Sequence, residues 1–397
     1  MRATNRWLLG AVGVGLLLAA CALAPKPGAA PAPAPVVAPS AAPAVAPAPG
    51  QAAAGSAAAA TQPAARLQAL IDAARQEGQL TLTWSAAALG GAEGAARLVD
   101  GVNRTYGLNL SVQFTPGPSM PELGSRLLQE AQAGRPATTD VYLTVSKSVL
   151  DLMRADAIAP ADWTAWAPNV QNPDLLAPNG AAVQVAAFMP GFTYNSSKLT
   201  GDAVPRSMDD LLQPRYTGRI ASTSYAGTFV ELASPEVWGE ARTVEYVTKL
   251  ADQLGGLIRC GEAERLISGE FDLFGLDCGN FDARRFQAQG APLDHFIPRD
   301  AAIIFHWYMT VPKNAAHPAA AKLFINYMLG REAQDYVFEK HYSDEPLVPG
   351  SKAVAELEKA QAAGAHFTPV DVAFYQRMDN AEADRITAEL QRIVQHQ

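Results

Sequence analysis

Helix and strand patterns alternate along the chain from residue 66 onward, and this order restricts the possible folds more than any other feature. Apolar residues with helical spacing occur over residues 67–74, and an apolar–polar alternation typical of a strand follows over residues 80–84. The same pair of patterns recurs over residues 95–102 and 108–114, and a third strand is expected over residues 140–144. A βαβα order joins parallel strands through helices, so the sequence predicts an α/β fold whose mostly parallel sheet is covered on both faces.

Capping residues mark where two of the predicted helices begin. Ser119 and Glu122 have the spacing of a capping box, and Gly134 is expected to end the same helix. Either Ser146 or Ser148 is expected to cap the helix that follows the third strand.

The second half of the chain repeats the alternation. Strands are expected over residues 219–222 and 271–274, with a helix opening at Gly227 and Thr228. A later apolar strand over residues 301–307 precedes a helix that starts at Pro318. A chain of 397 residues is long enough for two domains. The two α/β units, followed by this further strand and helix, therefore predict a bilobed molecule.

The N-terminus has the features of an export signal. Arg2 and Arg6 precede an apolar run over residues 7–20, which is short for a membrane-spanning helix. The run ends in Leu18-Ala19-Ala20-Cys21, which resembles the bacterial lipobox, in which the cysteine receives lipid and becomes the mature N-terminus. We expect a signal peptide over residues 1–20 and lipidation of Cys21, anchoring the chain at the outer face of the cytoplasmic membrane or in the periplasm. The alternative is a cysteine of the fold behind an ordinary cleavage site.

A segment of Ala, Pro, Gly and Ser follows Cys21 and reaches residue 65. Nine prolines lie between Pro25 and Pro49, and such a composition favours extended polyproline geometry over a packed core. We expect residues 21–65 to form a lipidated tether that lets the folded part reach a membrane partner. A linker without that role is the alternative.

The charge of the chain narrows the classes of molecule that it can bind directly. Arg2, Arg6 and Lys26 are the only charged residues before residue 66, so the remaining chain carries 28 basic and 39 acidic groups. This acidic balance excludes nucleic acid or an anionic bilayer as a favoured direct partner.

Cys260 and Cys278 are the only thiols left in the exported part, and we expect them to form a disulfide. Two separately buried cysteines are the alternative.

A series of ordered segments resembles family 1 extracellular solute-binding proteins, the receptors of ABC importers, and especially the branch that includes ferric-iron and small-organic-anion binders. The resemblance covers roughly residues 66–350. The segments are Gln76-Glu77-Gly78, Thr139-Asp140-Val141, Phe192-Thr193-Tyr194-Asn195, the run over residues 209–220, the run over residues 311–318 and Ala321-Lys322-Leu323-Phe324.

The resemblance implies a type II periplasmic-binding-protein-like fold, with two α/β lobes joined by hinge strands. The chain would cross between the lobes near residues 185–190 and 297–301, so that residues 66–187 with 298–397 form the first lobe and residues 188–297 the second. A small solute would bind between the lobes and close them, and the closed form would dock on an ABC permease. Ferric members of this branch carry adjacent tyrosines where this chain has residues 275–281, which contain none, so the resemblance argues against iron.

Loops that follow strands, and helices that begin after them, are expected to face one crevice between the lobes. The free NH groups at the helix starts Ser119 and Thr228 favour a carboxylate or phosphonate. Helix capping is the alternative role for each serine, and a solvated loop is the alternative for Asp277 and Asn280. The predicted ligand-binding residues are Ser85, Ser119, Ser146, Tyr225, Gly227, Thr228, Asp277 and Asn280.

Signatures of enzymes are missing from the sequence. It contains no G-x-S-x-G, H-E-x-x-H, Walker or C-x-x-C motif, and its six histidines are scattered without metal-ligand spacing. His306 is the histidine with most functional promise, because it lies beside Trp307 and Tyr308 at the end of an apolar strand. We expect a monomer without enzyme activity, cofactor or metal. The alternatives are a secreted lipoprotein hydrolase, a ferric-ion receptor and a sensor that works without a permease.

Overall fold

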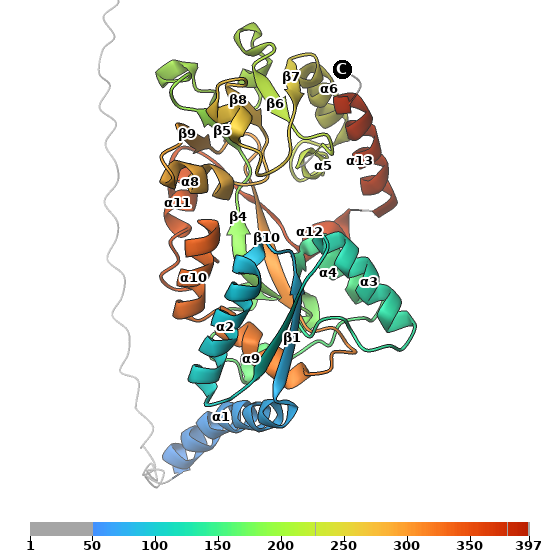
Figure 1. The fold of residues 1–397 in the computed structure, drawn as a ribbon, viewed down its shortest axis with the longest axis vertical. Coiled ribbons are helices and arrows are strands. Elements are labelled where there is room, and N and C mark those ends of the chain that lie inside the picture. The colour runs from blue at the N-terminus through green and yellow to red at the C-terminus, as the bar shows by residue number, and fades with distance from the viewer. Residues whose placement is uncertain (1–50, 227, 379, 396–397) are drawn as a thin grey trace, which may run out of the picture. The chain divides into compact units, whose positions relative to one another are not determined.

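The structure is a computed structural model that describes residues 51–226, 228–378 and 380–395. The predicted signal peptide, Cys21 and Gly227 lie outside the described residues. Residues 53–397 form one unit, in which two α/β lobes are connected by strands (Figure 1). Among the described residues, no helix combines the length and apolarity needed to cross a membrane.

The first lobe is built on six strands. β1 and β2 pair in parallel, with Gln79 opposite Ser111 and Trp84 opposite Pro116, and a bridge between Leu82 and Val141 places the third strand beside β1. β10 lies antiparallel to β3 and β4 and parallel to β11. The strands are β1 (Gln79–Trp84), β2 (Ser111–Pro116), β3 (Tyr142–Val145), β4 (Val183–Phe188), β10 (Ile303–Thr310) and β11 (Thr368–Val370).

Helices cover both faces of this first-lobe sheet. Met309 of β10 packs in the cluster that contains α2 and α9, whereas its neighbour Tyr308 packs in the cluster that contains α3 and α4. Figure 1 shows α2 and α10 on one side of β10 and α3, α4 and α12 (Val372–Arg377) on the other. The helices are α2 (Gly91–Tyr106), α3 (Met120–Gln132), α4 (Ser146–Arg154), α9 (Pro318–Met328), α10 (Arg331–His341) and α11 (Val354–Ala362).

The second lobe has a five-stranded sheet in the order β7-β6-β8-β5-β9. β6 is parallel to both β7 and β8, and β5 is antiparallel to β8 and β9. Its elements are β5 (Phe192–Asn195), β6 (Ile220–Ser222), α5 (Phe229–Leu232), α6 (Glu240–Ala251), β7 (Leu254–Leu257), α7 (Glu264–Ile267), β8 (Leu273–Gly275), α8 (Phe281–Ala288) and β9 (Leu293–Phe296).

The chain passes between the lobes at both places that the resemblance implies. β4 ends at Phe188 and β5 begins at Phe192, and the return runs from Phe296 of β9 to Ile303 of β10. A third passage was not foreseen: α12 (Val372–Arg377) packs on α4 of the first lobe, but α13 (Asn380–Gln395) packs on α5 and α6 of the second.

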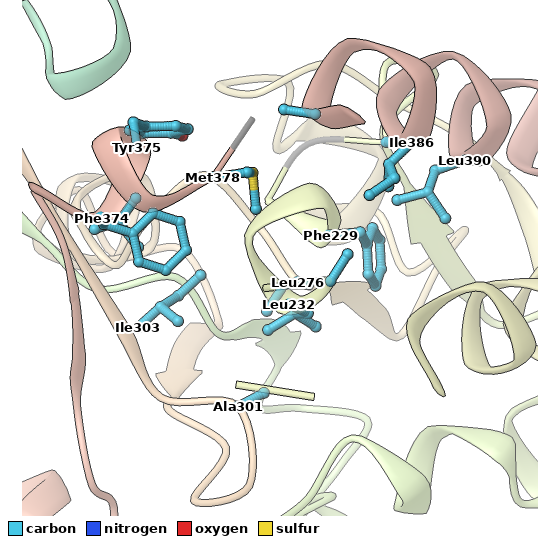
Figure 2. Packing of buried hydrophobic residues seen from close by; sticks show 14 of the residues in the cluster. Phe229, Leu232, Leu276, Ala301, Ile303, Phe374, Tyr375, Met378, Ile386 and Leu390 are labelled. Atoms are coloured by element: carbon cyan, nitrogen blue, oxygen red, sulfur yellow. The ribbon is translucent and has the colours of Figure 1, made fainter. Parts of the chain in front are cut away.

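The assignment of residues 298–397 to the first lobe is therefore wrong for α13. Its apolar stripe is nearly inaccessible, with Ile386 and Leu390 at most 1% exposed, and Figure 2 shows both side chains beside Phe229 of α5. Burial of this stripe against the second lobe is what determines where the helix docks.

The tether also ends earlier than predicted. Helix α1 (Gln51–Glu77) begins before residue 66, so residues 51–65 are helical rather than extended. The prolines responsible for the polyproline prediction end at Pro49, and the alanine-rich stretch that follows has high helix propensity. Glu77, at the end of α1, accepts hydrogen bonds from the Ala319 and Ala320 amides (3.0 and 2.8 Å) and so caps α9.

Two local predictions have different outcomes. The capping box of α3 is confirmed, because both the Ser119 amide and hydroxyl donate to Glu122 (3.0 and 2.7 Å). The predicted cap of α4 is wrong, because Val145 occupies the N-cap position and Ser146 is already the first helical residue. The Ser146 hydroxyl is buried and donates to the Val370 carbonyl oxygen (2.6 Å), so contact with β11 replaces the capping role.

Candidate functional site

The first-lobe side of the site is formed where β1 and β2 end. The Gly117 amide donates to the Trp84 carbonyl oxygen (2.8 Å), so the loop after β2 lies directly beside the loop after β1. This register brings Ser85, which is half-buried, and Ser119, which is exposed, to the same end of the lobe.

Helix α10 holds the loop after β1 in place. The Leu89 amide donates to Nε2 of His341 (2.9 Å), and the Tyr336 hydroxyl donates to the Leu89 carbonyl oxygen (3.1 Å). Leu89 itself has a φ of 48°, a strained value that these two contacts help to maintain. The loop next to Ser85 is thus a defined surface rather than a free segment.

The second-lobe side is formed where the parallel strands β6 and β8 end. The Thr228 hydroxyl lies 3.5 and 3.4 Å from the carbonyl oxygens of Leu276 and Asp277, which joins the two loops. Cys260 and Cys278, the predicted pair, are linked by a disulfide with Cα atoms 5.9 Å apart. Tyr225 lies over this disulfide, and its 40%-exposed side chain accepts a hydrogen bond from the Cys260 amide (3.2 Å).

Thr228 does not begin a helix of useful length. It occupies the N-cap of α5, which has only four residues, and its hydroxyl makes no capping hydrogen bond. A single turn adds few aligned peptide dipoles, so the anion-binding role expected from the helix end at Thr228 has little physical basis.

The polar atoms of Asp277 and Asn280 form hydrogen bonds within the protein, chiefly with the loop after β8 and with the segment that links the two lobes. Asp277 accepts from the Gly191 and Gly279 amides (both 3.0 Å) and from the Thr193 hydroxyl (2.6 Å). Asn280 accepts from an amide of the hinge and donates to Glu356 (2.7 Å). Both residues are at most 2% exposed, so their side chains position the loop after β8 in this structure.

A buried ionic cluster joins α11 to the second lobe. Nε2 of His295 lies 3.3 Å from Asp277, its Nδ1 lies 3.8 Å from Glu356, and Arg284 bridges Glu356 (2.6 Å) and Asp294 (2.7 Å). Burial favours neutral His295, but Asp277 and Glu356 outweigh that effect and raise the pKa of His295 to about 9. Burial also opposes ionised Glu356, yet His295 and Arg284 hold the pKa of that carboxyl well below its usual range. The hinge side therefore carries charged, mutually compensated side chains.

The sequence interpretation missed a cation at the site. Arg285 of α8 donates to Asp282 (2.7 Å), but its buried Nε has no hydrogen-bond partner among the described residues. Burial, followed by the positive charges of Arg285 and Lys340, lowers the pKa of His341 to about 4. Arg285 of the second lobe thus acts electrostatically on the histidine that holds the loop after β1. Its place in the first turns of a helix that follows a strand-end loop was a usable signal.

Aromatic side chains line the same region between β4, β10, α8 and α10. The Trp307 ring centroid lies 4.7 Å from that of Phe188 and 4.9 Å from that of His341, and Phe188 lies 5.2 Å from Phe281. At the end of β6, the buried hydroxyls of Ser222 and Thr223 have no hydrogen-bond partner among the described residues. Unpartnered hydroxyls and aromatic rings are both features of sites that bind small polar organic molecules.

No group of three His, Cys, Asp or Glu side chains in the described part of the chain could hold a metal ion. The unpartnered donors named above are Nε of Arg285 and the hydroxyls of Ser222 and Thr223, which can bind an anion without forming a covalent bond. The arrangement is therefore suited to holding a solute by hydrogen bonds and charge.

Comparison with known proteins identifies the class. The model of the bacterial extracellular solute-binding proteins matches residues 138–376, and the chain belongs to this family. Its solved structural neighbours have the fold of periplasmic binding proteins, with two α/β lobes.

Particular relatives follow from the same comparison. The chain is 30% identical over 152 residues to the Fe(3+)-binding periplasmic protein of Serratia marcescens. The matched stretch is 38% of this chain and only 43% of the length of that relative. The substrate-binding protein of an ABC transporter from Agrobacterium tumefaciens has a TM-score of 0.64 at 16% identity, over 80% of this chain and 94% of that one. Iron-bound HitA from Pseudomonas aeruginosa has a TM-score of 0.60 at 18% identity, over 79% of this chain and 99% of that one.

Proposed function

We propose that this chain is the solute receptor of an ABC importer, and that it captures a small organic anion between its two lobes for delivery to a membrane permease. The observation that carries the choice of an anion is Arg285, whose buried Nε has no partner among the described residues. Its influence on His341 supports a position near the loop after β1. A carboxylate or phosphonate would supply the acceptor that Nε lacks.

The strand-end loops would supply the remaining contacts. Ser85 and Ser119 belong to the first lobe, and Tyr225 with Gly227 belongs to the second; Gly227 lies outside the described residues. Ser146, Thr228, Asp277 and Asn280 are buried and already have partners, so they would act by positioning these loops. Ser119 donates to Glu122 and Tyr225 accepts from the Cys260 amide, but both residues are exposed and would exchange these partners for the solute. A solute that contacts both lobes only when they are closed would shift the equilibrium toward the closed form.

Export and anchoring complete the proposal. Lipidation of Cys21 would hold the receptor at the membrane, with the tether reaching to the start of α1 at Gln51. Fatty-acid labelling of cells that express the chain should be lost in Cys21→Ala. Labelling that persists in this variant would contradict the anchor without affecting the binding proposal.

Iron is the second candidate solute, because one relative is an Fe(3+)-binding protein. Residues 275–281 contain no tyrosine, and the described residues offer no three-residue acidic, histidine or cysteine cluster. Phenolate and carboxylate oxygens are the hard donors that ferric iron requires. These observations favour the organic anion.

The experiment is a calorimetric titration of the full chain with carboxylates, phosphonates, polyamines, sugars and ferric citrate. An organic anion should bind most tightly, and Arg285→Gln should weaken that binding about tenfold or more, because a charge-assisted hydrogen bond contributes roughly 1.5–3 kcal/mol. Arg206→Gln removes an exposed arginine of the same lobe and should leave the affinity unchanged. Tightest binding of ferric iron or a polyamine, or equal affinity in Arg285→Gln, would contradict the proposal.

A further inference from the structure

A cavity of about 550 Å³ lies in the first-lobe part of the chain. Its walls come from β4, β10 and β11, from the start of α12, from α11 and from the segments over residues 173–178 and 345–347. None of the described residues that line it belongs to residues 189–297, so it is separate from the loops around Tyr225 and Arg285. Its volume lies in the range of small-molecule sites.

The cavity is acidic. Asp174, Glu345 and Asp371 line it, and its described lining contains no lysine or arginine. Its one histidine, His306, lies with Nδ1 3.1 Å from Glu345, so Asp174 and Asp371 are the carboxylates available to a ligand. Among the described residues, neither Asp174 nor Asp371 forms an ion pair with a lysine, arginine or histidine. Burial, together with the negative charges of Asp371 and Glu345, raises the pKa of Tyr308, which also lines the cavity. Carboxylates in a partly enclosed space attract a positive charge more strongly than the same groups in open water.

An unpartnered amide gives an independent indication of a ligand. The Gln184 side chain is 5% exposed and lines the cavity, and its Nε2 donates to the Tyr308 hydroxyl (3.0 Å). Its Oε1 is buried and has no hydrogen-bond partner among the described residues. A buried carbonyl oxygen without a donor costs free energy, and a ligand N–H would relieve that cost.

Part of the cavity lining is apolar. Ile304, Leu357 and Phe367 line it, and they come from β10, from α11 and from the segment before β11. The ligand therefore needs a hydrogen-bond-donating cation at one end and an apolar body at the other.

We propose that this cavity binds an organic cation, a protonated amine on an aromatic or alkyl body. The ammonium group would donate to Gln184 and lie beside Asp371, while the body packs on Ile304 and Phe367. This site is independent of the anion site proposed above, because it uses other residues and selects the opposite charge.

The test uses the full chain and one probe, 2-phenylethylamine, followed by calorimetry and by chemical-shift changes in NMR spectra. The uncharged 2-phenylethanol has nearly the same shape and should bind at least tenfold more weakly. Asp371→Asn should also weaken amine binding at least tenfold; asparagine keeps a side-chain oxygen that can still accept from the Phe374 amide at the start of α12. Glu358→Gln, an exposed acid of α11, is the matched control and should bind the amine like the unaltered chain.

Two further variants separate this site from the anion site and from loss of folding. Arg285→Gln should leave amine binding unchanged, and Gln184→Leu, which removes the unpartnered amide, should weaken it without loss of the folded circular-dichroism spectrum. Equal affinity for the amine and the alcohol, unchanged binding in both Asp371→Asn and Gln184→Leu, or loss of amine binding in Arg285→Gln would each overturn the proposal.

Discussion

The buried charge of His295 makes the stability of this protein depend on pH in a defined direction. Its pKa is raised from 6.5 to about 9, chiefly by Asp277 acting against the effect of burial. The folded state therefore binds the proton more tightly than the unfolded state does. This contribution to stability is fully present below about pH 6.5 and is lost as the pH rises to about 9.

The size of the effect follows from the same values. Each pH unit between the two pKa values corresponds to about 1.4 kcal/mol, so the full contribution is about 3 kcal/mol. The His295 side chain is 0% exposed, so solvent screening reduces the figure little. Asp277, Glu356, Arg284 and Asp294 are the other charged groups of the same cluster.

Urea unfolding measured between pH 6 and pH 10 tests this reasoning. The difference in free energy of unfolding between the unaltered chain and His295→Gln should shrink by about 3 kcal/mol over this range, because glutamine does not titrate. His366→Gln replaces an exposed histidine and should follow the unaltered chain at every pH. A constant difference between the unaltered chain and His295→Gln would show that folding does not raise the pKa of His295.

Three more predictions concern stability. Burial raises the pKa of Glu231 to about 7, so the contribution of Glu231 to stability falls as the pH rises from 4.5 to 7. Glu231→Gln should therefore be more stable than the unaltered chain at pH 8, by at most about 3 kcal/mol. Equal stability of the two chains in urea at pH 8 would contradict this. Reduction of Cys260–Cys278 should lower the free energy of unfolding by about 3 kcal/mol in the chain-entropy model, measured with and without dithiothreitol; a midpoint unaffected by the reductant would refute it. Leu390→Ala should cost about 2–5 kcal/mol because Leu390 is 0% exposed, whereas Gln391→Ala beside it should cost little; similar unfolding midpoints for the two variants would disprove the docking of α13.

The sequence by itself determined the class of fold and several local features. The alternating patterns around β1, the capping box of Ser119 and the two hinge passages are all present in the structure. Each depends on neighbouring residues or on the order of elements along the chain, and this information is local or sequential. The apolar residues of α13 also have helical spacing in the sequence, and Ile386 and Leu390 lie on the face that is buried.

The tertiary structure alone decided which surfaces those elements meet. The apolar stripe of α13 specifies that it must be covered, but only docking on α5 and α6 places it in the second lobe. Likewise Glu356 reaches His295 from a distant part of the chain, and Ser146 bonds to Val370 instead of capping its own helix. Hydrogen-bond and ion partners depend on which segments pack together after long loops close, and residue spacing carries no record of that choice.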